Sequence, residues 1–314
     1  MTQARQWVAV DFGGPEVLRC IDVDVPEPGP GQVTIAVRAA GMNPADAKHI
    51  AASQDRELLP LTIGYEVAGA ITALGPDSEL ASGGGAVGDE VLAQVTGGYT
   101  TAITVPASSV HAKPPALTFP EAANLLLVGT TAADLLHTCG ASAGETVLLH
   151  GAAGSVGVSV LQQARQLGAR VVGTASRANF GLVRRFGGTP VEYGAGLLAR
   201  VREAAPEGIA AALDTVGSDE AGDVSLALVA DRKRVVTIVA ASRAKADGYV
   251  FVGASNPESG PFRARARAGI LRLARDGKLI VPIAQTFSFE QAPAAVTALT
   301  GPHPAGKLAL VNER

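Results

Sequence analysis

The chain has 314 residues, a length that accommodates about two domains around sizeable buried cores. Its 26 Lys and Arg against 29 Asp and Glu give a formal net charge of −3, so no basic field attracts nucleic-acid phosphates or anionic lipid. A charged fraction of 18% beside 47% apolar residues is typical of a compact globular protein. These values argue against nucleic acid or a membrane surface as the primary partner.

Cysteine usage and the apolar runs indicate the compartment. Cys20 and Cys139 are far apart and show no CxxC spacing, which argues against a disulfide framework or a thiolate metal cluster. The N-terminal residues have no long apolar core behind a basic start, and the longest apolar stretch, 122–133, is too short to span a bilayer. We therefore expect a cytoplasmic protein without membrane attachment.

The first part of the chain, from Trp7 to about Pro115, consists of short apolar runs separated by turn residues. The runs are VAV, VTIAVR, VAGAITALG and DEVLAQV. This texture predicts a β-rich module of short strands. From Phe119 onward PEAANLLLVGTTAADLLHTCG has helical periodicity, with Pro120 in its first turn and Gly140 after its end. We place a domain boundary there.

Apolar runs and amphipathic stretches alternate through the second part of the chain. The order is TVLLHGA, SVLQQARQLGA, RVVGTAS, LVRRFGG, TPVEY, AALDTVG, RVVTIVA and YVFVG. Strand, helix and strand in succession predict right-handed crossovers and a parallel sheet. A basic helix at 262–277, LIVPIAQTF, a short helix and the strand KLALV follow. The fold class is thus α/β, with residues 119–254 as a doubly wound domain and residues 1–118 and 255–314 as the β-rich domain.

The strongest motif is HGAAGSVG, residues 150–157, which lies between a predicted strand and a predicted helix. On a GxGxxG template Gly157 is the third glycine, Gly154 the second, and Ala152 occupies the first position. Gly154 allows the backbone to approach a pyrophosphate, Gly157 allows the helix to pack on the strand, and the helix N-terminus supplies free N–H donors. We predict dinucleotide binding by Ala153, Gly154, Ser155, Val156 and Gly157.

The residues after the second strand of this domain favour NADPH over NADH. An NAD site places an acidic residue about 20 positions beyond the glycines, to bind the ribose hydroxyls. No Asp or Glu occurs between Gly151 and Pro190, and the strand ends with Ser176 and Arg177. A serine can donate to a 2′-phosphate and an arginine can pair with it. The alternative is that Arg177 is only a solvated surface residue.

Several segments together give a family resemblance that covers nearly the whole chain. They include PEPGPGQVTIAVRAAGMNPADAKH, LTIGYEVAGAITALG, GDEVLA, GGYTTAITVPA, LLLVGTTAADLL, HGAAGSVG, DTVG and GKLAL, in that order. The chain resembles the quinone oxidoreductase group of the medium-chain dehydrogenases/reductases, which includes zeta-crystallin and the alkenal/enone oxidoreductases. The resemblance implies a GroES-like β-rich domain, a Rossmann domain and a homodimer.

The resemblance also implies that the chain has no catalytic zinc. Zinc alcohol dehydrogenases of the superfamily carry a Cys and a His at the positions that hold Asn43 and Tyr65 here, together with a structural lobe of four cysteines. This chain has two cysteines and five scattered histidines, so neither site has the ligands that zinc needs. We predict no metal site.

Candidate catalytic residues follow from the same resemblance. Asn43, in NPAD, resembles the family asparagine near the nicotinamide and the substrate, although NP also builds turns without a functional role. Lys48 occupies the lysine position of the NPVDxK motif of alkenal/enone oxidoreductases, where many quinone reductases have Tyr. IGYEVAG resembles their PGYDVAG, and Tyr65 lies within it. Lys48 or Tyr65 is the candidate proton donor, directly or through water, and protonation by solvent is the alternative.

Further cofactor contacts are implied at four positions. Thr131, in GTTAAD, resembles the threonine at the nicotinamide ribose or amide, and Tyr193, in VEY, resembles a tyrosine that packs at the 2′-phosphate. Tyr193 is equally explained as a core residue at a strand end. Lys307, in GKLAL, matches a family lysine close to the cofactor, and Val239, in RVVTIVA, is a further candidate contact.

The sequence therefore predicts an NADPH-dependent oxidoreductase that transfers a hydride to the activated C=C bond of an α,β-unsaturated carbonyl. Two alternatives remain open at this point. A quinone is also a flat conjugated electrophile, so an NADPH:quinone oxidoreductase explains the same residues. A non-catalytic NADPH-binding sensor would keep the phosphate loop without turnover.

Overall fold

The computed structural model describes residues 2–52, 55–253 and 256–312, with side chains except at residue 52. The chain divides into two compact units: unit 1 comprises residues 1–127 and 281–314, and unit 2 comprises residues 128–280. These limits differ from the expected boundaries at 118/119 and 254/255. Helix α9 (Ser259–Arg275) belongs to unit 2, where Arg263 pairs with Asp134 at 2.8 Å and Ile270 lies against Gly129.

Unit 2 is built on a six-stranded parallel sheet with the order β11-β10-β9-β12-β13-β14. Chain order reverses between β9 and β12, which is the doubly wound arrangement, and the predicted parallel sheet is confirmed. Its strands are β9 (Thr146–His150), β10 (Arg170–Ala175), β11 (Thr189–Glu192), β12 (Ala211–Asp214), β13 (Val235–Thr237) and β14 (Val250–Phe251). Its helices are α3 (Leu126–Thr138), α4 (Ser155–Leu167), α5 (Phe180–Arg185), α6 (Leu197–Ala204), α7 (Asp219–Leu228), α8 (Ala241–Asp247) and α9. The first two residues of α3 fall in unit 1.

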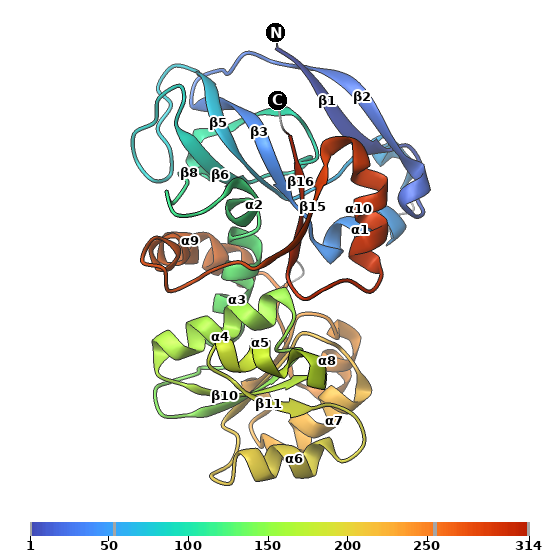
Figure 1. The fold of residues 1–314 in the computed structure, drawn as a ribbon, viewed down its shortest axis with the longest axis vertical. Helices are drawn as coiled ribbons and strands as arrows, with labels where there is room; N and C mark the ends of the chain where they lie inside the picture. Colours follow the sequence, from blue (N-terminus) through green and yellow to red (C-terminus); the bar gives the residue numbers. More distant parts are fainter. Residues whose placement is uncertain (1, 53–54, 254–255, 313–314) are drawn as a thin grey trace. The chain divides into compact units, whose positions relative to one another are not determined.

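Alternation along β9 divides the unit 2 core into two layers. Val147 and Leu149 pack with buried residues of α3, α4 and α5, whereas Leu148 packs with those of α6, α7 and α8. Successive side chains of a strand point to opposite faces, so an all-apolar strand must be covered on both. In Figure 1, α4 and α5 lie above β10 and β11, and α6 lies below them.

The long helix predicted from Pro120 to Cys139 is interrupted in the structure. A capped turn, α2 (Phe119–Ala122), precedes α3, with Thr118 and Glu121 forming a capping box. Asn124 follows: its Nδ2 donates to Pro120 O and its Oδ1 accepts from Met42 N. An asparagine side chain that bonds to backbone groups competes with the helical pattern, which explains why apolar periodicity alone missed the break.

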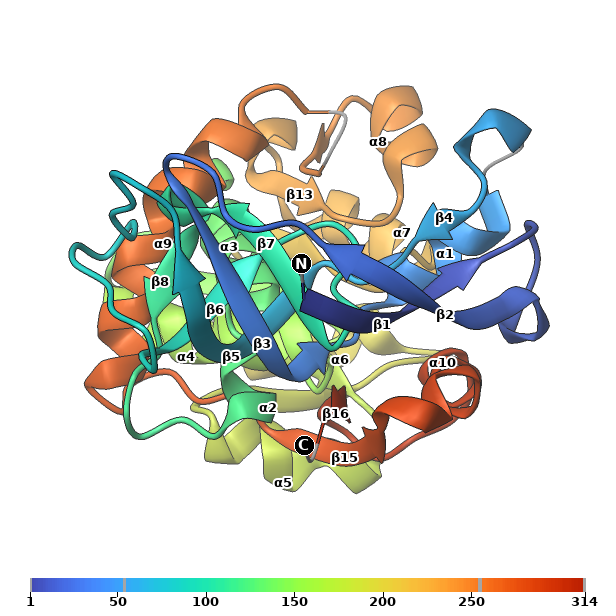
Figure 2. The ribbon, with the colours of Figure 1, turned by 90° about the horizontal axis from the view of Figure 1, so that it is seen from above.

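Unit 1 contains a mixed sheet and a three-stranded antiparallel sheet. The mixed sheet has the order β15-β16-β3-β5-β6-β8, with β7 also paired to β3, and the small sheet has the order β2-β1-β4. Both views show β1 and β2 as one long antiparallel ribbon (Figures 1 and 2). The strands are β1 (Thr2–Ala9), β2 (Leu18–Val25), β3 (Gln32–Gly41), β4 (Leu61–Thr62), β5 (Glu66–Leu74), β6 (Glu90–Gln94), β7 (Ala102–Pro106), β8 (Val110–Ala112), β15 (Ile283–Ser288) and β16 (Lys307–Val311). The helices are α1 (Pro44–Ala52), α2 and α10 (Ala292–Thr300).

The β-rich unit has two apolar clusters. One lies among β3, β5, β6, β7 and β8, and the other joins β1 and β16 to α1 and α10. The C-terminal strand β16 pairs antiparallel with β3, so a segment from the end of the sequence completes the sheet that the N-terminal third begins. Across the described ranges, no helix combines the length and apolarity that crossing a membrane requires.

Candidate functional site

The glycine-rich turn lies at the carboxyl end of β9, beside the point where strand order reverses. Gly151 has φ +80°, a left-handed conformation that favours glycine, and its N–H donates to Thr174 Oγ1 at 3.1 Å. Gly154 is the N-cap of α4 and makes no side-chain cap bond, so the first-turn N–H groups point out of the helix without an intrahelical acceptor. Such an end attracts an anion.

The absence of a side chain at Gly157 allows α4 to approach the turn closely. A Cβ on this residue would lie 2.2 Å from Gly151 O and 2.8 Å from Ala152 Cα. A Cβ on Gly154 would lie 3.3 Å from Gly151 O, its nearest neighbour. The two glycines therefore differ: Gly157 is required by packing within the fold, and Gly154 leaves open space in front of the helix end.

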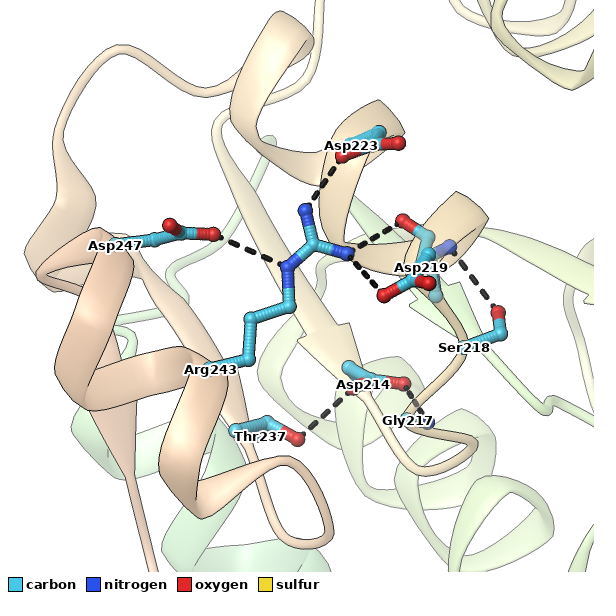
Figure 3. Close-up of polar contacts among 9 residues, drawn as sticks. Asp214, Gly217, Ser218, Asp219, Asp223, Thr237, Arg243 and Asp247 are labelled. Carbon is cyan, nitrogen blue, oxygen red and sulfur yellow. Dashed lines mark hydrogen bonds and ion pairs between the residues drawn. The ribbon is translucent and has the colours of Figure 1, made fainter.

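The loops after β12 and β13 bring exposed apolar side chains to the same edge. Val216 is 54% exposed and Val239 is 37% exposed, and both follow strands that end at this edge. Asp214 holds the loop after β12: its Oδ1 accepts from Val216 N and Gly217 N, each at 2.9 Å. Figure 3 shows the bond to Gly217 and a second one, in which Asp214 Oδ2 accepts from Thr237 Oγ1. Sequence reasoning did not single out Asp214, although DTVG after a buried strand was a usable signal.

Arg243 of α8 ties that helix to α7. Its guanidinium pairs with Asp219 at 3.2 Å, Asp223 at 2.5 Å and Asp247 at 3.0 Å, and also donates to the Asp219 carbonyl (Figure 3). A Cβ on Gly222 would lie 2.5 Å from this guanidinium, which would have to shift to accommodate it. These bonds of Arg243 connect the first turn of α7, which follows the Asp214 loop, to α8.

The residues predicted for the 2′-phosphate lie just beyond β10. Ser176 follows the strand, and its Oγ accepts from Asn179 Nδ2 at 3.2 Å. Arg177 opens the 3₁₀ turn Arg177–Asn179 and donates through Nε to Glu192 Oε2 at 2.7 Å. Tyr193 is 56% exposed rather than a core residue. A surface hollow of about 570 Å³ next to them is lined partly by Arg177, Glu192 and Arg200.

Thr131 presents a buried hydroxyl in unit 2. The residue lies on α3 and is 4% exposed, and its Oγ1 has no hydrogen-bond partner among the described residues. A buried hydroxyl without a partner costs free energy. Thr131 therefore has an unmet donor and acceptor that a bound ligand group would satisfy.

Two candidate residues of unit 1, Asn43 and Lys307, form a buried polar network with Glu66. The side-chain oxygen of Asn43 accepts from Lys307 Nζ at 2.5 Å, and its Nδ2 donates to Glu66 Oε2 at 3.1 Å. Lys307 also donates to the Met42 carbonyl, and Glu66 Oε1 accepts from Leu127 N at 2.7 Å. Hydrogen bonds on both sides fix the orientation of the Asn43 amide, and the lysine that the resemblance assigned to the cofactor lies inside this network.

Asp46 forms the second branch of the network. Its Oδ2 accepts from Asn43 N and from Tyr99 OH, each at 2.8 Å, whereas its Oδ1 is buried without a partner among the described residues. Burial raises the pKa of Asp46 from 3.8 to about 7, against the lowering effect of these hydrogen bonds and of Lys307. Burial likewise raises the pKa of Glu66 and lowers the pKa of Lys307. Sequence reasoning gave no role to Glu66 or Tyr99.

The Asp46 carboxyl predicts a pH-dependent stability. Its folded pKa of about 7 lies above the ordinary value, so its contribution is complete below about pH 4 and is lost as pH rises through about 7. We expect the unfolding free energy of the native chain to fall by about 2 to 3 kcal/mol between about pH 5 and pH 8 relative to Asp46→Asn. The amide oxygen of Asn keeps both accepted bonds. Urea denaturation of the two proteins across this range is the measurement, and parallel pH curves would contradict it.

Tyr65 and Lys48 occupy different surroundings. Tyr65 directly precedes β5, and its hydroxyl lies 2.8 Å from His49 Nδ1 on α1. Burial is the main cause of its raised pKa, with a smaller effect of Asp46. Lys48, on the same helix, is exposed. The structure thus brings Tyr65 together with His49, which the sequence did not suggest, and leaves Lys48 outside the buried network.

Metal-ligating side chains do not gather in the described part of the chain: no group of three or more His, Cys, Asp or Glu is placed to hold a metal ion. The positions equivalent to zinc ligands hold an amide, Asn43, and a phenol, Tyr65. Both are poor zinc ligands compared with thiolate and imidazole.

Comparisons with known proteins agree with this architecture. The Alcohol dehydrogenase GroES-like domain matches residues 29–115, and the Zinc-binding dehydrogenase family matches residues 188–310. The native structure of a mycobacterial quinone oxidoreductase is 30% identical, with a TM-score of 0.79 over 98% of this chain and 100% of the other. A mycobacterial structure complexed with NADPH is also 30% identical, with a TM-score of 0.83 over the same shares. The chain belongs to the medium-chain dehydrogenase/reductase superfamily, in its quinone oxidoreductase group.

Curated relatives are matched over part of their length. Human quinone oxidoreductase is 38% identical over 52% of this chain, and the match spans 50% of the human protein. A Spectinabilin polyketide synthase system protein of Streptomyces orinoci is 33% identical over 98% of this chain, which corresponds to 14% of that protein. The GroES-like and Rossmann-type fold expected from the sequence is confirmed.

Proposed function

We propose that the chain is a zinc-independent, NADPH-dependent reductase that adds hydrogen across the activated C=C bond of an α,β-unsaturated carbonyl. The observation that carries the proposal is the buried network in which Lys307 and Glu66 hold the Asn43 amide from both sides. A fixed amide at the position of a metal ligand supplies oriented dipoles rather than a Lewis acid. This is the environment expected for a hydride transfer that proceeds without a metal.

The coenzyme fits unit 2. The space in front of Gly154, the free first-turn N–H groups of α4 and the unpartnered Thr131 hydroxyl are groups that a dinucleotide would engage. Ser176 and Arg177 at the end of β10 would hold a 2′-phosphate. When bound, NADPH supplies the hydride. The NADPH complex of the mycobacterial homologue supports this choice.

Tyr65 is our candidate for the proton donor. Hydride addition to the β-carbon leaves negative charge on the enolate, and a proton must reach the α-carbon or the oxygen. The Tyr65 hydroxyl is hydrogen-bonded to His49 Nδ1, and an imidazole nitrogen can either donate or accept a proton. As the phenol gives its proton to the substrate, a protonated His49 would pass its Nδ1 proton to the tyrosine oxygen, and a proton from water would then restore His49.

An NADPH:quinone oxidoreductase is the second candidate, because the human and mycobacterial relatives carry that name. A panel of enones, alkenals and quinones, each assayed anaerobically with NADPH and with NADH, separates the two. Faster NADPH oxidation with enones supports the proposal, and a preference for quinones replaces it with the alternative. NADPH binding without oxidation by any acceptor would instead indicate a sensor.

Substitution at Tyr65 tests the proton donor. We expect Tyr65→Phe to lower kcat with enones about a hundredfold while the affinity for NADPH stays unchanged, because only the proton transfer is removed. His49→Gln should lower kcat less than Tyr65→Phe does. Lys48→Ala is the matched comparison on α1: full kcat in this variant excludes Lys48, whereas a loss larger than that of Tyr65→Phe would assign the proton to Lys48 instead.

Homodimerisation and a cytoplasmic location are further parts of the proposal. β14 is one of the two edge strands of the unit 2 sheet, and an edge strand presents unpaired backbone groups to a second copy. The substrate is a small conjugated carbonyl compound, and neither nucleic acid nor a membrane is a partner. Light scattering of the native chain and of Val250→Pro would test the dimer, which the variant should weaken.

A further inference from the structure

Glu192 lies where the sequence indicated no acidic residue. It ends β11, and the parallel register pairs it with Ala175, the last residue of β10. Its carboxylate accepts from Arg177 Nε at 2.7 Å. The acid-free stretch that favoured NADPH runs from Gly151 to Pro190, so Glu192 is just outside it in sequence but adjacent to its end in the sheet.

This position determines which coenzyme a doubly wound domain prefers. At the end of the second strand, a carboxylate binds the ribose hydroxyls of NAD, whereas an arginine accommodates the 2′-phosphate of NADP. Here the arginine and a carboxylate are both present and are paired with each other. A 2′-phosphate that approaches Arg177 must therefore separate the guanidinium from Glu192, or it must bind with the negatively charged Glu192 carboxylate next to it.

The exposure of the pair determines how strongly it competes. Arg177 is 80% exposed and Glu192 is 36% exposed, so water screens the pair and it opens at small cost. Arg200 also lines this hollow, but its Nε, Nη1 and Nη2 donate to the carbonyl oxygens of Glu192, Ala195 and Gly194, which hold its guanidinium at the turn after β11. These bonds fix the turn after β11 and hold the Glu192 backbone at the hollow next to Arg177.

We propose that Glu192 is a coenzyme-specificity residue: it competes with the adenosine 2′-phosphate for Arg177 and thereby lowers the preference for NADPH over NADH. The inference rests on the proposed dinucleotide site and deepens it. The chain is then an NADPH-preferring protein that still accepts NADH, and one carboxylate limits the ratio of the two affinities.

The test measures the adenosine half of the coenzyme alone. Calorimetric titrations of the full chain with 2′,5′-ADP and with 5′-AMP report the 2′-phosphate contribution without any turnover. We expect Glu192→Gln to bind 2′,5′-ADP about three- to tenfold more tightly. The substitution removes the ion pair that occupies Arg177, and it removes the carboxylate charge that repels the 2′-phosphate. Binding of 5′-AMP should be unchanged or weaker.

Matched variants assign the effect to the pair. Glu203→Gln removes the same charge from an exposed residue of the same hollow and should change the affinity for 2′,5′-ADP less than twofold. In an Arg177→Ala background, Glu192→Gln should lose most of its effect. Equal effects of the Glu192 and Glu203 variants, or an undiminished effect without Arg177, would overturn the proposal.

The outcomes also separate this inference from the proposed function. If the native chain binds 2′,5′-ADP and Glu192→Gln tightens it, but no acceptor is reduced, the inference stands and the reductase proposal fails. If turnover is observed and Glu192→Gln leaves 2′,5′-ADP binding unchanged, only the inference fails. A native chain that binds neither adenosine ligand rejects both.

Discussion

Gly157→Ala should lower the free energy of unfolding of unit 2 by about 3 kcal/mol, because overpacking against rigid atoms is destabilising. The added Cβ would meet Gly151 O at 2.2 Å and Ala152 Cα at 2.8 Å. Both are backbone atoms of the turn after β9, so relief requires α4 to move away from the strand. The measurement is urea denaturation of Gly157→Ala beside the native chain, followed by titration with NADPH, which should bind at least tenfold more weakly.

Gly154→Ala separates the coenzyme effect from the folding effect. Its Cβ has only Gly151 O nearby, at 3.3 Å, and its φ of −71° suits alanine. We expect near-native stability with weakened NADPH binding. Gly181→Ala is the control, because nothing lies within 4 Å of its Cβ. If Gly157→Ala is as stable as Gly181→Ala, the packing argument is wrong. If Gly154→Ala binds NADPH with native affinity, the coenzyme does not need the space at Gly154.

Lys307→Met should be the most destabilising substitution in unit 1, with a loss of about 3 to 5 kcal/mol of unfolding free energy. Lys307 is 4% exposed, and its ammonium is hydrogen-bonded to Met42 O and to Asn43 Oδ1. Its charge offsets that of buried Glu66. Without the cation, Glu66 must bind a proton or remain a buried uncompensated charge, and both cost free energy.

The double variant Lys307→Met/Glu66→Gln tests the cause. Removing the carboxylate charge as well should restore more than half of the lost stability in urea denaturation at neutral pH. Lys48→Met is the control, because Lys48 is an exposed lysine of the same unit, and it should change stability by less than about 0.5 kcal/mol. A Lys307→Met loss as small as that of the control would show that the network does not depend on the cation.

Local patterns identified much of the scaffold. The alternation of apolar runs and amphipathic stretches predicted the parallel sheet, since periodicity is a property of each segment by itself. The turn 151–157 was also visible in sequence, because the glycine spacing reflects backbone geometry within a few residues. The break between α2 and α3 was missed because it depends on Asn124 bonding to Met42, a residue 82 positions away.

The composition of the candidate site came from contacts that no local pattern encodes. Asn43 was named from its motif, but its neighbours Glu66 and Lys307 are separated from it by 23 and 264 residues. The pairing of Tyr65 with His49 likewise depends on the position of α1 relative to the segment before β5. Long-range pairing of this kind is determined by sheet register and core packing, not by spacing along the chain.

The end of β10 most clearly separates what the sequence predicts from what the strand pairing adds. The sequence by itself determined a glycine turn that admits a dinucleotide and a second strand that ends in Ser176 and Arg177, because both features are contiguous in the chain. Only the tertiary structure decided that Glu192 pairs with Arg177, because the register of β11 against β10 brings together residues 15 positions apart. Adjacent parallel strands place their carboxyl ends side by side, and this juxtaposition supplied the charge that sequence order concealed.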